Sequence, residues 1–275
     1  MLVFISLFTF KTILNIMFLQ KRFHYTVIFI LLSLSFLISS CKKEDPGMLN
    51  GEFDKKVLVE EFTAEWCGFC TQAAPDFNEI IDKYGDEALC VGVHYSDFYE
   101  VSYPATASYL FEFYKVNGLP GTLVNRNYDE TREWIVQVEK NLGYKSNAGI
   151  KLETDVLDNK LNINVHYTAN KDYENILLSV YLVEDHVVES SPGAQSGGGG
   201  NFIHRNVLRE VLTSKTGNPV TIKTDSSYVT SFTVSNISKY KKADLKIMAF
   251  LNEGISKSFE FINGNQTSAG LDSGW

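Results

Sequence analysis

The chain has 275 residues, of which 44% are hydrophobic, and this is enough to build two modest domains. It carries 25 basic and 33 acidic side chains, a net charge of −8, and three of the basic ones lie in residues 1–40, which hold no acidic residue. The remaining chain therefore has 22 basic against 33 acidic side chains, a net charge of −11, which argues against nucleic acid as a partner.

Residues 1–40 have the pattern of an export signal rather than of a fold. Lys21 and Arg22 precede an apolar run over residues 25–37, which is the charged region followed by a short apolar region that a secretory signal requires. A run of thirteen residues is too short to span a bilayer comfortably. A start at Met17 would give a leader of ordinary length, and the alternative to a leader is an anchor of two helices.

The leader ends in Leu37-Ile38-Ser39-Ser40-Cys41, which resembles the lipobox of bacterial lipoproteins. Cys41 is therefore the predicted lipidation site, and residues 41–51 are a lipidated tether that attaches the protein to a membrane. The tether begins Lys42-Lys43-Glu44-Asp45-Pro46, which resembles the tag that sends lipoproteins of Bacteroidetes to the cell surface; the alternative is a solvated linker. The prediction is a lipoprotein of the cell envelope.

Residues 52–146 alternate strands with helices. An apolar run over 56–62 leads into the cysteines, and an apolar stripe at spacings of three and four then predicts a helix closed by Gly85. Residues 89–93 read as a strand covered on both faces, residues 105–116 as a helix, residues 122–124 as a strand, and residues 129–143 as a helix. This alternation predicts an α/β domain. Because Asn125 and Arg126 run almost directly into the last helix, we expect no further strand there and a sheet trimmed at that edge.

Residues 147–264 have the period of two that is typical of half-buried strands, clearest where Leu161, Ile163, Val165 and Tyr167 alternate with polar residues. Further strands are expected near 150–154, 176–184, 202–212, 220–223, 228–234, 245–251 and 258–262. This predicts an all-β immunoglobulin-like sandwich, followed by a C-terminal tail over 265–275. A glycine-rich stretch over 190–200 is predicted to be a mobile surface loop.

Cys67-Gly68-Phe69-Cys70 is the motif that carries chemistry. Two cysteines separated by two residues at a strand-to-helix turn place the first sulfur over the free N–H groups at the helix start, an end that favours anions. A thiol there has its pKa lowered from about 8.5 toward roughly 3.5–7.5 and becomes a nucleophile at neutral pH. Cys67 is the expected attacking sulfur, and Cys70 is the expected resolving thiol.

The run Ala64-Glu65-Trp66-Cys67-Gly68-Phe69-Cys70, with Pro75 five residues later, resembles the thioredoxin active site. The resemblance implies that Glu61, six residues before Cys67, shuttles the proton of the resolving thiol; the alternative is a surface residue of an edge strand. Gly118-Leu119-Pro120-Gly121-Thr122 resembles the family's cis-proline loop with one extra glycine. Pro120 then takes the cis-proline position, and Leu119 and Pro120 flank the substrate. Trp66 and Pro75 support the site.

Taken together, four features resemble one family, the outer-membrane-protein-twenty-eight-related lipoproteins of Bacteroidetes. They are the leader, this thioredoxin-like half, the segment 124–126 and the stretch His204-Arg205-Asn206-Val207-Leu208-Arg209. The resemblance covers nearly the whole chain. It implies a location at the outer membrane more clearly than it implies an activity. The stretch 204–209 belongs to the pattern, but no chemical mechanism for it follows from its residues.

Several residues also have plainer interpretations. A zinc site needs four ligands, and once Cys41 is lipidated only Cys90 remains beside the motif, so we expect no metal and no cofactor. Cys90 itself lies in an apolar run and is predicted to be a packing residue. His94 has no evident partner in the sequence. His204 and Arg205 are either an anion or carboxylate site or, as we expect, the solvated face of a strand.

Two functions remain open. The first is a membrane-tethered thiol–disulfide oxidoreductase that acts on protein thiols and disulfides of the envelope and depends on a redox partner that the sequence does not name. The second is a surface binding or adhesion protein that uses the thioredoxin-like half as a scaffold and the β half for contacts. The cysteine motif motivates the first, and the tag and the large second domain motivate the second.

Overall fold

The computed structural model describes residues 53–101, 106–129, 131–188, 202–254 and 260–275. They all belong to one compact unit, Leu49–Trp275. The predicted leader, the tether with Cys41, and the glycine-rich stretch over 190–200 lie outside the described residues. Among the described helices, none combines the length and the apolar character needed to cross a membrane.

The first half alternates strands and helices, as predicted. Its strands are β1 (Phe53–Asp54), β2 (Val57–Thr63), β3 (Ala88–His94), β4 (Gly121–Val124), β5 (Asn127–Asp129) and β6 (Lys145–Ser146). Its α-helices are α2 (Cys70–Tyr84), α3 (Thr106–Phe113) and α4 (Trp134–Asn141), with a 3-10 turn η2 (Gly85–Glu87). Both faces of β2 and β3 are buried, which explains the nearly continuous apolar sequence of β3 and leaves Glu60 and Glu61 of β2 as buried acids.

The second half is built from strands, also as predicted. They are β7 (Ala148–Leu157), β8 (Lys160–Ala169), β9 (Tyr173–Glu184), β10 (Val187–Val188), β11 (Ile203–His204), β12 (Val207–Val211), β13 (Asn218–Ile222), β14 (Ser227–Ser235), β15 (Leu245–Glu253) and β16 (Phe261–Ser268). Two 3-10 turns, η3 (Ile237–Lys239) and η4 (Lys242–Asp244), precede β15. The predicted single strand over 202–212 is instead two strands, because Asn206 has a φ of +48° that interrupts the extended backbone.

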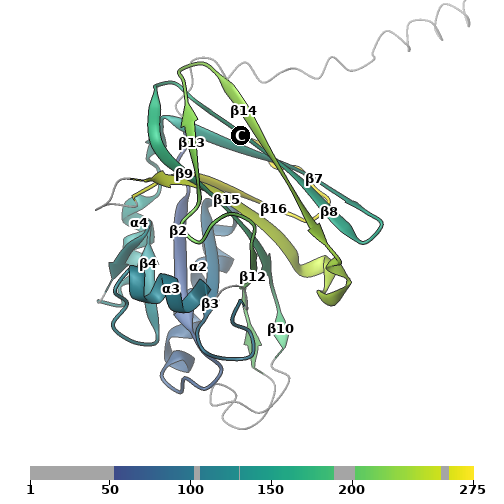
Figure 1. The fold of residues 1–275 in the computed structure, drawn as a ribbon. Coiled ribbons are helices and arrows are strands. Elements are labelled where there is room, and N and C mark those ends of the chain that lie inside the picture. Colours follow the sequence, from purple (N-terminus) through teal and green to yellow (C-terminus); the bar gives the residue numbers. More distant parts are fainter. Residues whose placement is uncertain (1–52, 102–105, 130, 189–201, 255–259) are drawn as a thin grey trace, which may run out of the picture. The chain divides into compact units, whose positions relative to one another are not determined.

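One sheet runs through both halves (Figure 1). Within the described residues it has nine strands in the order β16-β15-β9-β12-β3-β2-β4-β5, with β13 pairing beside β9. The two halves join where β12 pairs in parallel with β3, Val207 opposite Gly92. The predicted domain boundary at residue 146 falls between β6 and β7, but the sheet itself continues across the two halves.

The sheet is covered differently along its length. In the first half α3 lies on one face, while α2 and α4 lie on the other and pack on apolar residues of β2 and β3. In the second half a separate sheet, β14-β8-β7, packs on β9, β13 and β15 and completes a β-sandwich. Alternate residues of β9 and β15 therefore face two cores, for example Leu182 toward the sandwich and Tyr181 toward the helix-covered side. The immunoglobulin-like type of this sandwich stays a prediction.

The expectation of a trimmed sheet edge is wrong, because β5 pairs with β4 as a short antiparallel hairpin. Asn125 and Arg126 have φ values of +51° and +66°, as in the two-residue turns that match the twist of paired strands. Asn125 also ties the turn to β2, since its Oδ1 accepts the N–H of Leu58 at 3.0 Å. Arginine is an unusual residue at positive φ, so Arg126 does not mark this turn in the sequence.

Candidate functional site

The cysteine motif lies where β2 passes into α2. Cys67 and Cys70 form a disulfide, with Cα atoms 5.4 Å apart, and α2 begins at Cys70. The N–H of Cys70 donates to Cys67 Sγ at 3.2 Å. Only 5% of Cys67 is exposed, and Cys70 is fully buried. The structure thus gives the first sulfur an N–H donor and a helix start, the arrangement that stabilises a thiolate once the disulfide is reduced.

Apolar side chains surround the disulfide. Leu119 packs against the cluster of Ala64, Cys67 and Cys70, and the Leu119–Pro120 peptide bond is cis. Trp66 and Phe69 are 52% and 68% exposed and flank the cysteines on the surface. The sheet register explains why the proline loop lies here, because β4 follows Pro120 directly and pairs with β2, Gly121 opposite Phe62. Pro75 is exposed within α2, and its supporting role stays a prediction.

A loop that the sequence did not single out supports the motif from the side of β3. Trp66 Nε1 donates to the carbonyl oxygen of Ser96 at 3.1 Å, and the N–H of Glu65 donates to Asp97 Oδ2 at 2.8 Å. His94 Nδ1 lies 2.6 Å from the same oxygen of Asp97. Burial alone would raise the pKa of Asp97, but the hydrogen bonds from His94 and from backbone N–H groups hold it below its ordinary value. His94 therefore has a partner three residues away.

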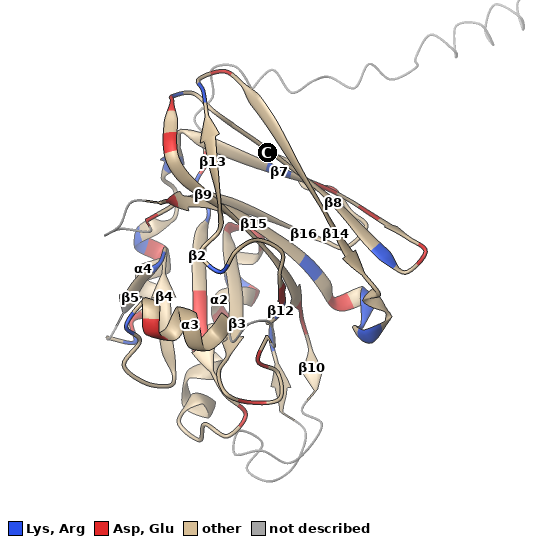
Figure 2. Cartoon of the chain, in the orientation of Figure 1, with Lys and Arg blue, Asp and Glu red and all other residues tan. Residues whose placement is uncertain are grey.

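Glu61 is buried in the central strand β2, so its alternative interpretation as an edge-strand surface residue is wrong. It shares a small cavity with Ala74 and Asn78 of α2, one and two turns after Cys70. Desolvation raises the pKa of its carboxyl to about 8. A carboxyl with such a pKa takes up and releases protons near neutral pH. Figure 2 shows the acidic segment of β2 within the sheet rather than at its rim.

The neighbouring acid, Glu60, points to the opposite face of β2. Its Oε1 lies 3.2 Å from Arg126 Nη2, with both side chains fully buried, and accepts the Tyr181 hydroxyl at 3.4 Å. Arg126 also donates to the Tyr181 hydroxyl at 2.9 Å and lies 4.8 Å from the ring of Phe250. Arg126 thus joins the first half to the second through a buried polar contact, which is a structural role for the segment 124–126.

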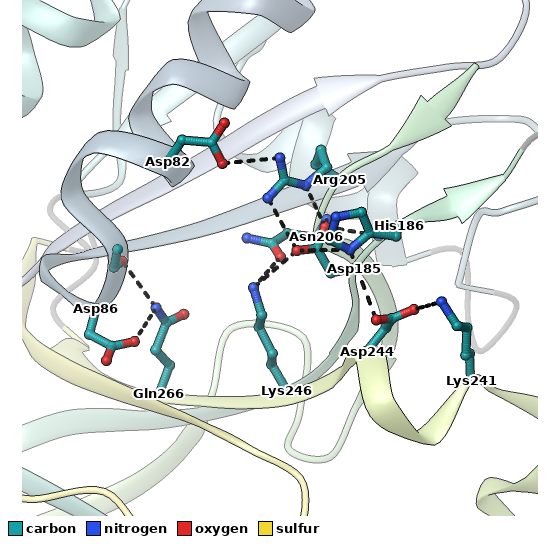
Figure 3. A network of polar contacts seen from close by, with 11 residues as sticks. Asp82, Asp86, Asp185, His186, Arg205, Asn206, Lys241, Asp244, Lys246 and Gln266 are labelled. Carbon is teal, nitrogen blue, oxygen red and sulfur yellow. Dashed lines mark hydrogen bonds and ion pairs between the residues drawn. The ribbon is translucent and has the colours of Figure 1, made fainter. Parts of the chain in front are cut away.

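His204 and Arg205 do not form the solvated strand face that we expected. His204 is buried, and Arg205 binds a carboxylate of this chain, Asp185, with Nε at 2.7 Å from Oδ1 (Figure 3). The same arginine reaches Asp82 of α2 at 3.2 Å. The sequence could not show this, because Asp185 is 20 residues from Arg205 and Asp82 is 123 residues away.

The contacts of Asp185 continue as a network between the halves (Figure 3). Lys246 donates to Asp185 at 3.3 Å and to Asn206 Oδ1 at 2.9 Å, and the Asn206 N–H donates to Asp185 at 3.2 Å. Burial alone would raise the pKa of Asp185, but the hydrogen bond from Arg205 and the charge of Lys246 keep it well below its ordinary value. This network fixes the segment 204–206 between α2, β9 and β15.

Cys90 is a free, buried thiol in β3, which confirms the packing interpretation, and burial raises its pKa. Within the described part of the chain, no group of three histidine, cysteine or acidic side chains is placed to hold a metal ion. The residues that the structure brings together are therefore the cysteine pair and Leu119 of the cis-proline loop, while Glu61 lies on β2 and lines the cavity beneath α2.

The fold and the site define a thioredoxin-fold protein with a disulfide in the redox motif at its helix start. Residues 48–141 match the thioredoxin family model, and residues 107–270 match the model described as outer membrane protein Omp28. The chain belongs to the Omp28 family and carries a thioredoxin domain in its N-terminal half. The two matches overlap over residues 107–141, in keeping with a sheet shared by both halves.

Curated relatives match the first half. Thioredoxin H9 of Arabidopsis thaliana is 29% identical over 103 residues, which cover 37% of this chain and 74% of that protein. Thioredoxin H4 of the same plant is 30% identical over 84 residues, which cover 30% of this chain and 71% of that protein.

Two solved structures resemble most of the chain. HBP35 of Porphyromonas gingivalis has a TM-score of 0.68 at 22% identity and covers 80% of this chain and 77% of its own. A protein of Agrobacterium tumefaciens has a TM-score of 0.52 at 11% identity and covers 82% of this chain and 99% of its own. At these identities the likeness shows a shared fold alone.

Proposed function

We propose that this protein is an outer-membrane lipoprotein that exchanges disulfides with protein partners in the cell envelope through Cys67 and Cys70. One observation carries the proposal: Cys67 Sγ accepts the N–H of Cys70 at 3.2 Å at the start of α2. In the reduced protein this donor and the free N–H groups of the first helical turn favour a thiolate over a thiol. Cys67 is then the nucleophile, and Trp66, Leu119 and Pro120 border the place where a partner disulfide approaches.

The exchange runs in two steps. The Cys67 thiolate attacks one sulfur of the partner disulfide, so that a mixed disulfide forms and one partner thiolate leaves. The Glu61 carboxylate then takes the proton of the Cys70 thiol, the Cys70 thiolate attacks Cys67 Sγ, and the second partner thiolate leaves. Two electrons pass from the cysteine pair to the partner. A dithiol donor restores the reduced pair, and the same steps in reverse oxidise a partner dithiol.

Insulin reduction by dithiothreitol tests the activity. The wild-type protein and Cys90→Ala, which alters a cysteine outside the motif, should both accelerate the reaction, whereas Cys67→Ser should not. In a separate incubation of the reduced protein with insulin and no dithiothreitol, Cys70→Ser should retain its partner as a stable mixed disulfide, because the resolving thiol is missing. A wild-type protein no faster than Cys67→Ser would contradict the proposal and favour the alternative, a binding or adhesion protein that uses the thioredoxin fold as a scaffold.

The lipoprotein part of the proposal rests on Cys41 and on membership of a family described as outer membrane proteins. Cells fed labelled palmitate should incorporate it into the wild-type protein and not into Cys41→Ala. Protease treatment of intact cells separates the two possible leaflets, since a surface-exposed protein is digested and a periplasmic one is protected. Labelling of both proteins alike would contradict lipidation at Cys41.

A further inference from the structure

Polar residues gather at the carboxyl ends of β2 and β3, on the face that α2 covers. Glu61 lies opposite Gly92 and Thr63 lies opposite His94 in the register of the two strands. All four line the cavity beneath α2, which has a volume of about 20 Å³. A cavity of this size has room for one water molecule.

The far wall of this cavity comes from the other half of the chain. His204 and Arg205 line it, and Gly92 allows their segment to approach, because the Gly92 N–H donates to the carbonyl oxygen of Asn206 at 2.8 Å. A side chain at residue 92 would place its Cβ only 3.2 Å from the carbonyl oxygen of Arg205. The network of Arg205, Asp185, Asn206 and Lys246 holds this segment in place (Figure 3).

The imidazole of His204 lies among aromatic rings. Its centroid is 4.7 Å from that of His94, 5.2 Å from that of Tyr99 and 4.9 Å from that of Phe202. His204 is 4% exposed, and its buried Nε2 has no hydrogen-bond partner among the described residues. By contrast, the Nδ1 of His94 is held by Asp97 at 2.6 Å. The Nε2 of His204 is thus a buried ring nitrogen at the cavity that is free to exchange a proton.

The proposed exchange makes a demand on this cavity. Glu61 is itself only 5% exposed, yet it must lose its proton before it can accept the one from Cys70. At pH 7, below its pKa of about 8, most molecules carry that proton. Proton transfer therefore needs a route from Glu61 outward, and the residues that line the cavity determine it.

We infer that His204 relays the proton of Glu61 to solvent, which makes the β-rich half part of the redox site. One ring nitrogen accepts a proton from the Glu61 carboxyl, directly or through one water molecule, while the other nitrogen releases the proton that it carried. The ring is neutral before and after, and one proton leaves for each proton taken up. His204 acts on Cys70 only through Glu61, so it is a positioning residue. This inference rests on the proposed function.

The surroundings of His204 favour such a neutral relay. The pKa of His204 is lowered to about 3, chiefly by burial and to a smaller extent by the charge of His94, while Asp97 opposes the shift. The ring is therefore uncharged at physiological pH. The other titratable groups around it are Glu61 on β2, Tyr99 in the loop after β3, and Arg205 with its partner Asp185.

Acid-quenched mixing of the reduced protein with oxidised glutathione tests the relay. Mass spectrometry counts the mixed disulfide on Cys67 and the later Cys67–Cys70 disulfide separately, and no protein partner is needed. With His204→Phe at pH 7, we expect an unchanged first step and a second step slowed about tenfold, less than the roughly 10²-fold loss that removal of a general base causes. The slowing should disappear at pH 9, where Glu61 is already ionised. His166→Phe, the same change on β8 in the outer sheet, should match the wild type.

The possible outcomes are distinct. A second step as fast in His204→Phe as in the wild type at pH 7, or slowed equally at pH 7 and 9, would overturn the relay and leave the proposed function standing. Absence of the Cys67–Cys70 disulfide from the wild type would overturn both. If His204→Phe does not fold, His204→Gln replaces it, because an amide cannot exchange protons between two nitrogens and should show the same slowing at pH 7.

Discussion

Glu60 and Glu61 are neighbours on one strand, and the two faces of β2 put them to different uses. On one face, Glu60 is paired with the guanidinium of Arg126 and accepts the Tyr181 hydroxyl. On the other, Glu61 has no ion-pair partner among the described residues and lines a small cavity, where desolvation raises its pKa to about 8. Burial alone therefore does not give a carboxyl its role. The partner that the fold supplies decides between structure and proton transfer.

The largest change in the free energy of unfolding is expected on the Glu60 face of β2. Arg126→Met removes one partner of a fully buried pair and leaves the other uncompensated, which should lower the free energy of unfolding by about 3–5 kcal/mol. Urea unfolding measures it. The double variant Glu60→Leu with Arg126→Met should recover much of the loss, because no buried charge is then left alone. A single variant within about 1 kcal/mol of the wild type would contradict the importance of the pair.

On the Glu61 face, we expect the free energy of unfolding to depend on pH. The pKa of Glu61 is raised from 4.5 to about 8 by folding, so the folded state holds its proton where the unfolded state has lost it. Its stabilising effect is complete below pH 4.5 and is lost as the pH rises toward 8, at up to about 1.4 kcal/mol per pH unit.

Urea unfolding of the oxidised protein between pH 5 and 8 measures this slope. Glu61→Gln should flatten it, while Glu87→Gln, which alters an exposed acid, should leave it as in the wild type. Equal slopes in the wild type and Glu61→Gln would show that the pKa of Glu61 is not raised, and would remove the support for its role as a proton acceptor.

A smaller effect is expected where the Glu61 face meets the β-rich half. Gly92→Ala brings a Cβ to 3.2 Å from the Arg205 carbonyl oxygen, so strand β12 must shift slightly, at a cost of about 1 kcal/mol. Thermal unfolding detects the loss. Gly274→Ala, where a Cβ meets nothing within 4 Å, is the matched control. If the two variants unfold at the same temperature, the approach of the two halves at Gly92 is looser than the structure indicates.

Much of the first half could be predicted because its signals are local. The helix after the cysteines follows from an apolar stripe, and the alternation of strands and helices from runs of neighbouring residues. The turn at Asn125 and Arg126 was not predicted, because it contains no glycine, the residue that most often marks positive φ values. In the structure this turn brings Arg126 to Glu60, so a residue that looked like a departure from the thioredoxin pattern joins the two halves.

The interpretation of His204 and Arg205 failed for a different reason. Charged residues beside a glycine-rich stretch are typical of a solvated surface, and their partners lie on other elements: Asp185 at the end of β9, Asp82 on α2 and His94 on β3. Burial of a charged residue can be predicted only when its oppositely charged partner is known. For the same reason, the sequence does not reveal that His94 lies beside His204 of the second half.

Local sequence patterns predict the cysteine motif, the helix that follows it, the alternating first half and the strand-rich second half, because each depends on residues within a few positions of one another. Long-range contacts join the halves in a single sheet and select the acid on β2 that is paired. They also bring His204 to the cavity of Glu61. These features depend on contacts between residues 55 to more than 120 positions apart, such as Arg126 with Tyr181 and Glu60 with Tyr181, and no local spacing encodes such contacts.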